Sequence, residues 1–324
     1  LVTMEWWDDT WLNEAFAMWM ELRIADELRP EWGMGLQRVR DRSIALEADS
    51  VSTARRIRQP IETRHDIRGA FDGITYYKGM AVLEMIEAWL GEDVFRQGVN
   101  AHIARHAWGN ATAQELIEEF SRAAGRDVAP TFSSFLDQVG VPVISGAVAC
   151  GGAPEVALEQ RPYQPLGSPE GARERAWQVP ICAAWADNEP RRRECRLLDE
   201  PRETMPLGES GCPGWVLLND GMRGYYRLAV DRGEAQALLE GGGLSPAERL
   251  GLASDLQALV ASGDLPAGAA FQLVEVLARD VHPDVVGAAV DLLDSLESVV
   301  PDLSLIHISE PTRPAPLSRM PSSA

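Results

Sequence analysis

The sequence is poor in positive charge, and this shortage limits the partners that the protein can have. Its 324 residues include 30 Lys and Arg against 49 Asp and Glu, which gives a formal net charge of −19. No basic cluster offers a path for a phosphate backbone, and the RRREC run at 191–195 is more simply the polar edge of a strand. The composition therefore argues against nucleic acid as a partner.

Long apolar runs are missing as well. No stretch approaches the roughly 20 consecutive apolar residues that a membrane-spanning helix needs. The mean hydropathy of −0.16 is that of an ordinary globular chain. The sequence thus predicts no membrane span.

Cysteine is scarce, and all of it lies in one segment. The residues are Cys150, Cys182, Cys195 and Cys212. Their spacing does not match a zinc ribbon. An even set in one strand-rich segment is typical of disulfides and of an extracytoplasmic protein, but buried free thiols fit equally well. A cytoplasmic and a periplasmic or secreted location both stay open, and the cysteines favour the second.

The pattern of apolar residues changes twice along the chain. Residues 1–139 show helical periodicity. Residues 140–232 hold short Val-rich runs separated by Pro and Gly, which predict a small β-sandwich. Helical spacing returns over residues 233–302, where Ser245 and Glu248 form an N-terminal capping signal. With 324 residues, the chain is long enough for more than one domain.

The last segment, residues 303–324, differs from all that precedes it. It contains LSLIHISEPTR, which resembles a translated sequencing-library adapter, and the rest is rich in Pro and Ser. Such a composition lacks the apolar periodicity of a packed element. We expect this tail to be non-native or disordered and assign it no function.

The first 21 residues, LVTMEWWDDTWLNEAFAMWME, place a Trp-rich acidic run before an apolar helical stretch at 15–28. Glu14 opens that stretch, and Glu21 shares its face because helical neighbours recur every three to four residues. Taken alone, Glu14 is a helix N-terminal acid stabilised by the helix dipole. Glu21 is either a partner of a site around Glu14 or a solvated surface acid.

A second informative run, FDGITYYKGM, occupies residues 71–80. Adjacent tyrosines by themselves more often pack half-buried than take part in catalysis. Asp72 precedes the expected helix at Ile74, so it either caps that helix or orients a site nearby.

Together, VTMEWW, WLNEAFA and FDGITYYKG resemble motifs of the aminopeptidase N-like (alanyl aminopeptidase) family of gluzincin zinc metallopeptidases. The later run WVLLNDGMRGYYRLAVD resembles a packing motif of the same family, and the resemblance covers about residues 1–300. By this match, Glu14 is a zinc ligand. Tyr76, rather than Tyr77, is the residue that donates a hydrogen bond to the oxyanion of the tetrahedral intermediate. Ala15 stands where the family usually has Gly.

The resemblance implies a multidomain α and β fold. The helical lobe of a thermolysin-like catalytic domain would occupy residues 1–139, a small β-sandwich 140–232, and the start of an α-helical repeat domain 233–302. It also implies one catalytic Zn²⁺, held by Glu14 and by two histidines of an H-E-x-x-H motif that leave a fourth position for water. Only thirteen residues precede Glu14, so we expect both histidines upstream of residue 1 and an inactive chain when it is alone.

One pair of histidines within the chain has the spacing of such a zinc site. His102 and His106 lie four residues apart in HIARH, but Ile103 stands where a general base would be. We interpret both histidines as ordinary helix-surface residues.

The resulting prediction is a zinc aminopeptidase that hydrolyses N-terminal residues from peptides. The alternative is a metal-free homologue that serves as a scaffold or protein-interaction module. Intact Glu14 and Tyr76 argue against the alternative, because a scaffold needs neither. A related epoxide-hydrolysing enzyme is disfavoured because that branch lacks the β-sandwich.

Overall fold

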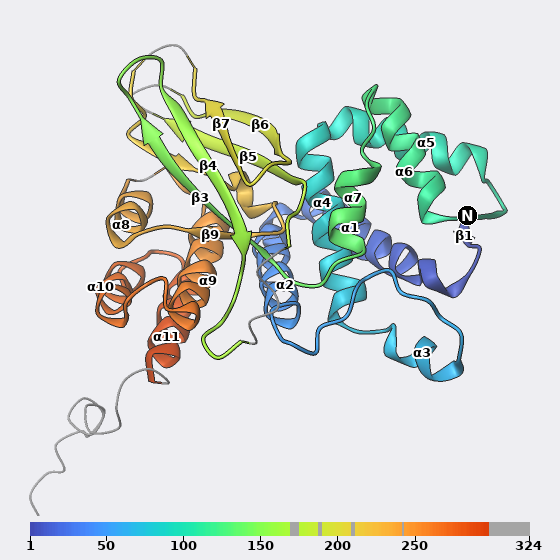
Figure 1. The fold of residues 1–324 in the computed structure, drawn as a ribbon, viewed down its shortest axis with the longest axis horizontal. Coiled ribbons are helices and arrows are strands. Elements are labelled where there is room, and N and C mark those ends of the chain that lie inside the picture. The colour runs from blue at the N-terminus through green and yellow to red at the C-terminus, as the bar shows by residue number, and fades with distance from the viewer. Residues whose placement is uncertain (169–174, 187–189, 209–210, 242, 298–324) are drawn as a thin grey trace, which may run out of the picture.

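The computed structural model describes residues 1–168, 175–186, 190–208, 211–241 and 243–297. Helices come first, strands follow and helices return (Figure 1). The helical elements of the first part are η1 (Trp7–Asp9), α1 (Thr10–Leu28), η2 (Pro30–Trp32), α2 (Met34–Ala48), α3 (Arg64–Gly69), η3 (Ile74–Lys78), α4 (Gly79–Leu90), α5 (Glu92–Arg105), α6 (Ala113–Ala124) and α7 (Ala129–Leu136). Division of the chain into separate domains stays a prediction.

Helix α4 is the centre of this first part. Its sequence, GMAVLEMIEAWL, is mostly apolar, and every residue except Leu90 is buried. A helix that is apolar on all sides must be surrounded by other elements. Helices α1, α5 and α7 and strand β5 pack against it. It ends before Gly91, whose φ of 86° favours glycine, as the sequence predicts.

A short parallel pair joins the start of the chain to the turn before α6. Strand β1 (Thr3–Met4) pairs with β2 (Asn110–Ala111). The sequence did not predict these strands, because two residues carry no periodic signal. The pair places the residues before α1 beside the end of α5.

The later strands form two sheets. In the first, the strand order is β7-β4-β3-β9, with β3 antiparallel to β4 and parallel to β9; in the second, it is β6-β5-β8, all antiparallel. The strands are β3 (Pro142–Ala149), β4 (Glu155–Pro162), β5 (Val179–Ala186), β6 (Arg192–Leu198), β7 (Arg202–Pro206), β8 (Trp215–Leu217) and β9 (Arg227–Ala229), with η5 (Asp220–Met222) between the last two. These strands lie within the segment 140–232 for which the sequence predicted short strands, although β7 is a polar edge strand without such an apolar run, in which only Met205 is buried.

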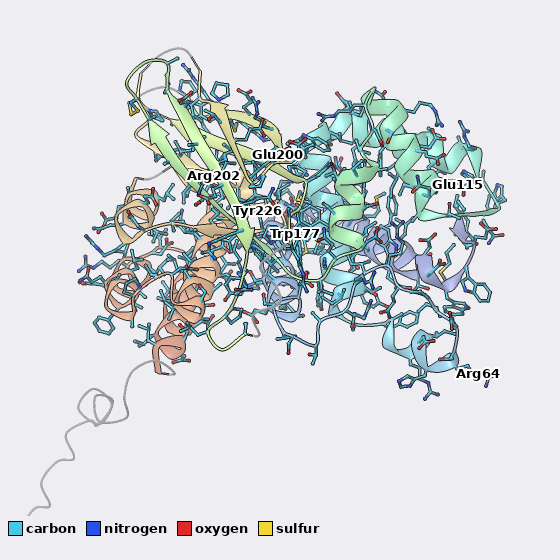
Figure 2. The ribbon with its side chains drawn as sticks, viewed as in Figure 1. Arg64, Glu115, Trp177, Glu200, Arg202 and Tyr226 are labelled. Carbon is cyan, nitrogen blue, oxygen red and sulfur yellow. A yellow bond between two sulfur atoms is a disulfide. The ribbon has the colours of Figure 1, made fainter. Side chains whose placement is uncertain are left out.

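Aromatic side chains fill the region where the sheets meet the first helices. Trp177 and Tyr226 lie there, near the centre of the molecule (Figure 2), and are 2% and 0% exposed. Tyr225 is also fully buried, and its hydroxyl donates to the carbonyl of Ala45 in α2 at 3.1 Å. These tyrosines are therefore packing residues, as the sequence predicts.

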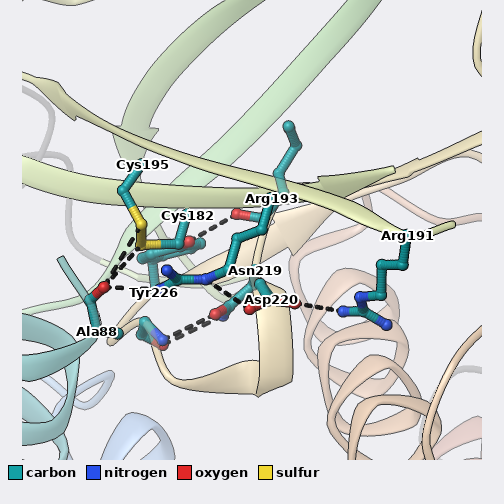
Figure 3. Close-up of a disulfide and its surroundings, with 10 residues drawn as sticks. Ala88, Cys182, Arg191, Arg193, Cys195, Asn219, Asp220 and Tyr226 are labelled. Carbon is teal, nitrogen blue, oxygen red and sulfur yellow. Dashed lines mark hydrogen bonds and ion pairs between the residues drawn. A yellow bond between two sulfur atoms is a disulfide. The ribbon is translucent and has the colours of Figure 1, made fainter. Parts of the chain in front are cut away.

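All four cysteines are paired. Cys150 bonds to Cys212, and Cys182 of β5 bonds to Cys195 of β6. The second disulfide lies against the end of α4, with its sulfurs 3.6 and 3.5 Å from the Ala88 carbonyl oxygen (Figure 3). Of the two readings left open by the sequence, the structure has the disulfides.

Four helices follow the strands: α8 (Arg232–Glu240), α9 (Pro246–Ser262), α10 (Ala267–Ala278) and α11 (Pro283–Glu297). The predicted capping box is present, with Ser245 accepting from the Glu248 amide. These helices share a hydrophobic cluster of their own. No helix among the described residues combines the length and apolarity needed to cross a membrane. The tail at 303–324 lies outside the described residues.

Candidate active site

Glu14 is positioned by the buried face of α1. Trp11, Ala15 and Trp19 recur at four-residue spacing and are at most 7% exposed. Glu14 lies beside this apolar stripe and is half-buried, and its Oε1 accepts from Asn13 Nδ2 at 3.3 Å. The helix begins at Thr10, so its first turn contains no acid. The interpretation of Glu14 as a helix N-terminal acid is therefore wrong.

Tyr76 lies in η3, a π-helical segment that continues without a break into α4. Asp72 caps the segment: its Oδ1 accepts from the amides of Ile74 and Thr75 at 3.0 and 3.2 Å. Tyr76 is half-buried, while Tyr77 packs against the hydrophobic core. Single π-helical turns are frequent at functional sites. Asp72 is thus the helix cap, the first of its two predicted roles.

A close approach of two backbones brings Glu14 and Tyr76 together. A Cβ added to Gly79 would lie 2.6 Å from the Cβ of Ala15, so only glycine allows this crossing of α1 and α4. Tyr76 precedes Gly79 by three residues and shares its side of the helix. Burial, a hydrogen bond with Glu14 and the negative charge of Glu14 raise the pKa of Tyr76. The phenol is therefore kept protonated, as a hydrogen-bond donor must be.

The Glu14 carboxylate is suited to bind a cation. Among the described residues, its hydrogen-bonding neighbours are Asn13 and Tyr76, and it forms no ion pair with a basic side chain. Carboxylate oxygen is one of the ligands that zinc accepts. The part of the chain that the structure describes contains no group of three or more potential metal ligands. Glu14 thus fits as one ligand of a zinc ion whose other ligands are not in this set.

Glu21, the other acid of α1 considered from the sequence, lies away from this site. Glu21 is exposed and lies toward Asp41 of α2, whose carboxylate it repels. It is a solvated surface acid, one of the two roles that the sequence left open.

Lys78, from the same motif as Tyr76, has an unexpected environment. It is fully buried, and its Nζ lies 2.8 Å from Asp49 Oδ2 and donates to the Gln138 carbonyl at 3.1 Å. Asp49 also accepts from the Tyr225 hydroxyl at 3.3 Å and from the Gly140 amide at 2.9 Å. Sequence reasoning missed Asp49, because nothing around it in the sequence marks it as buried.

The interpretation of the pair His102 and His106 needs correction. His102 is only 8% exposed and His106 is half-buried, so they are not surface residues. Their rings are 5.0 Å apart. Burial, followed by the charge of His106, lowers the pKa of His102. The periodicity of α5 underestimated their burial because α6 packs along this helix, with His106 Nε2 3.9 Å from Glu115 Oε1 of α6.

Comparisons with known proteins agree with this geometry. Residues 1–135 match the peptidase family M1 domain, and residues 215–306 match the ERAP1-like C-terminal domain. Aminopeptidase 2 of Candida albicans is 31% identical over 284 residues, which cover 86% of this chain and 30% of that protein. Leucyl aminopeptidase of Saccharolobus solfataricus is 30% identical over 266 residues, or 82% of this chain and 32% of that protein.

Puromycin-sensitive aminopeptidase of Caenorhabditis elegans is similar to a comparable extent, at 31% identity over 90% of this chain and 31% of that protein. Residues 1–135 thus form a peptidase family M1 domain, and this match confirms the resemblance seen in the sequence. It spans about 30% of the length of the curated relatives that it matches.

Proposed function

We propose that this chain is part of a zinc aminopeptidase that removes N-terminal residues from peptides. One observation carries the proposal: α1, which carries Glu14, packs against η3, which carries Tyr76, and α1 and α4 cross closely at Ala15 and Gly79, beside these two half-buried residues. The two residues are 62 positions apart, and sequence motifs alone had assigned them to one site. The aminopeptidase names of the relatives support the same activity.

Each residue has a defined role in this proposal. Glu14 holds the metal through its carboxylate, and two histidines of an H-E-x-x-H motif, which these 324 residues do not contain, complete the set. Bound zinc would polarise the scissile carbonyl and lower the pKa of a water ligand. The Tyr76 hydroxyl donates to the oxygen on which negative charge develops, and this stabilises the transition state more than the ground state.

We propose the same family architecture for the whole chain. Residues 1–139 are the helical lobe of a thermolysin-like catalytic domain, 140–232 a small β-sandwich, and 233–302 the start of a helical repeat domain. The order of the elements and the two matched regions support this assignment. The net charge of −19 supports peptides rather than nucleic acids as partners.

We also propose that the protein works in an oxidising compartment, such as a periplasm or the cell exterior. Two disulfides and no free cysteine among the described residues support this location, since cytosolic thiols are kept reduced. Thiol titration of the denatured protein from its native source is expected to find no free thiols. Four free thiols would contradict the proposed location.

The activity is tested in a longer polypeptide in which an H-E-x-x-H segment is fused before Leu1, called here the extended chain. It is expected to bind about one zinc and to hydrolyse an aminoacyl-anilide. Glu14→Gln is expected to lose both, because an amide is a poor zinc ligand. Glu21→Gln on the same helix is the matched control and is expected to keep both.

Two results would contradict the proposal. If Glu14→Gln keeps its zinc, Glu14 is not a ligand. If the extended chain binds no zinc and hydrolyses nothing, the scaffold alternative is favoured. The 324-residue chain alone is expected to show no tight zinc site in calorimetry, since one carboxylate cannot replace a three-ligand shell.

A further inference from the structure

Arg55, between α2 and α3, contacts the beginning of the helical segment that carries Tyr76. Its guanidinium binds Asp72 with both ends: Nε is 2.9 Å from Oδ2 and Nη2 is 2.5 Å from Oδ1. Nη2 also donates to the Thr75 hydroxyl at 2.7 Å. A two-pronged bond of this kind fixes orientation as well as distance.

Backbone carbonyl groups also bind the Arg55 guanidinium. Nη1 donates to the carbonyls of Arg56 and Ile57 at 2.9 and 3.4 Å, and Nη2 to that of Ala70 at 3.1 Å. The side chain is 17% exposed. Arg55 thus has little freedom to move, and it joins the chain after α2 to the turn that precedes η3.

Asp72 transmits this restraint to the helix. The oxygen that binds Arg55 Nη2 is the one that caps Ile74 and Thr75, and the Asp72 carbonyl accepts from the Tyr76 amide at 3.1 Å. The first amides of a helical segment have no partner within it, so the geometry of its first turn depends on such end contacts.

We propose that Arg55 is a positioning residue for Tyr76. The proposal rests on the proposed role of Tyr76 as a hydrogen-bond donor to the oxyanion. Such donors must be held within about 0.5 Å of the productive position. Through Asp72 and Thr75, Arg55 sets the start of η3 and so the place of the Tyr76 hydroxyl.

Arg58 offers a matched control from the same segment. It forms an equally two-pronged pair, with Nε and Nη2 at 2.8 and 2.6 Å from the oxygens of Asp137. Its side chain is 29% exposed, comparable to Arg55. Asp137, however, follows α7 and has no bond to η3. Substitution of Arg58 therefore measures the effect of losing a similar ion pair that does not contact η3.

The decisive experiment is a double-mutant cycle in the extended chain. Arg55→Ala is expected to lower kcat by about 10- to 100-fold with little change in KM, because a displacement of about 1 Å can cost about 100-fold. In the Tyr76→Phe background, the same substitution is expected to cost less than about 3-fold, because the group that it positions is gone. Arg58→Ala should leave kcat unchanged in both backgrounds. Equal losses from Arg55→Ala in the two backgrounds would overturn the proposal.

Chemical rescue gives a second readout. Added guanidinium is expected to restore part of the kcat of Arg55→Ala but to have no effect on Arg58→Ala. A purely structural loss would not recover in this way, so absence of rescue together with a large kcat loss would count against positioning.

Hydrogen exchange on the 324-residue chain separates this proposal from the proposed function. Arg55→Ala is expected to speed exchange of the amides at 74–78 by at least about 10-fold relative to those of α6, whereas Arg58→Ala should not. Unchanged exchange at 74–78 would overturn the positioning role whatever the activity. If exchange responds but Tyr76→Phe leaves kcat intact, the function assigned to Tyr76 fails and the restraint by Arg55 stands.

Discussion

The two faces of η3 differ in whether their polar side chains have charged partners. On one face, the Tyr76 hydroxyl is half-buried beside Glu14, and no basic residue neutralises that carboxylate. On the other, Lys78 is fully buried with Asp49, and the pair is hydrogen-bonded to the Gln138 carbonyl and the Tyr225 hydroxyl. A single five-residue segment therefore carries the candidate active site on one face and, on the other, a hydrogen-bonded network that stabilises the fold.

The difference follows from what each face meets. Lys78 points toward α2 and the sheets, where the charge must be paired because burial without a partner is costly. Tyr76 lies toward the first turns of α1. There, the Glu14 carboxylate forms no ion pair with a basic side chain among the described residues. Polar residues that stabilise a fold have their hydrogen bonds formed within it, whereas polar residues that bind a ligand have hydrogen-bonding groups free for that ligand.

The largest expected effect lies on the buried face. Lys78→Met is expected to lower the free energy of unfolding by about 3–5 kcal/mol, because it leaves Asp49 charged and unpaired in the interior. Urea denaturation of the 324-residue chain measures the loss. Arg279→Met, which removes the exposed pair with Glu275, is the control, with an expected change of about 0–1 kcal/mol. Similar losses in the two variants would show that the buried network is not special.

The next largest effect is expected on kcat, from substitution of Tyr76. In the extended chain, Tyr76→Phe is expected to lower kcat by about 10²–10³-fold, or about 2.7–4 kcal/mol, the cost of one oxyanion donor. KM and the unfolding free energy should change much less. Tyr77→Phe is the control and is expected to be nearly silent. A damaging Tyr77→Phe, or two silent variants in hydrolysis of an aminoacyl-anilide, would remove Tyr76 from the mechanism.

A smaller effect is expected where the two helices cross. Gly79→Ala would place a methyl group 2.6 Å from the Ala15 Cβ, so the helices must separate. Overpacking of this kind costs about 1–3 kcal/mol of stability. Gly287→Ala, in an exposed position of α11 with open space around it, is expected instead to stabilise by about 0.5–1 kcal/mol. Thermal unfolding of both variants decides, and a stabilising Gly79→Ala would mean that the crossing is not tight.

The smallest expected effect concerns His102, whose buried Nδ1 has no hydrogen-bond partner among the described residues. Burial and His106 lower the pKa of His102 in the folded protein, so the unfolded chain binds its proton more tightly. Stability from this group is therefore present above the unfolded pKa of about 6.5 and is lost as pH falls below it. His102→Gln should remove this part of the acid destabilisation, because glutamine does not titrate.

Urea midpoints of the wild type and His102→Gln at pH 7.5 and 5.5 check this sign. Raised pKa values of other buried groups, such as Asp9 and Glu84, act equally in both proteins and cancel in the difference. A wild type that loses less stability than the variant on acidification would contradict the expected direction.

Local sequence signals predicted most of the elements. Capping boxes, glycines at helix ends and alternating Val-rich runs depend on residues a few positions apart, so they can be read without the fold. The predictions failed where no local signal exists. The two-residue strands β1 and β2 and the polar strand β7 form because neighbouring elements offer backbone partners.

The site divides in the same way. Motif matches assigned Glu14 and Tyr76, and the structure brings them together, although their roles stay predictions. The burial of Asp49 as the partner of Lys78 and the burial of His102 were not fixed by sequence. Each depends on which element covers the residue, and spacing along one helix carries no information about that.

The sequence by itself predicted most of the helices and strands, the motifs of family M1, and the shortage of basic residues. Only the tertiary structure decided that α1 and α4 cross at Ala15 and Gly79, that the cysteines pair as they do, and that one face of η3 is open while the other is sealed. The physical reason is range. Propensity and capping act over one or two turns, whereas burial and the pairing of charges depend on neighbours that are distant in sequence and meet only when the chain folds.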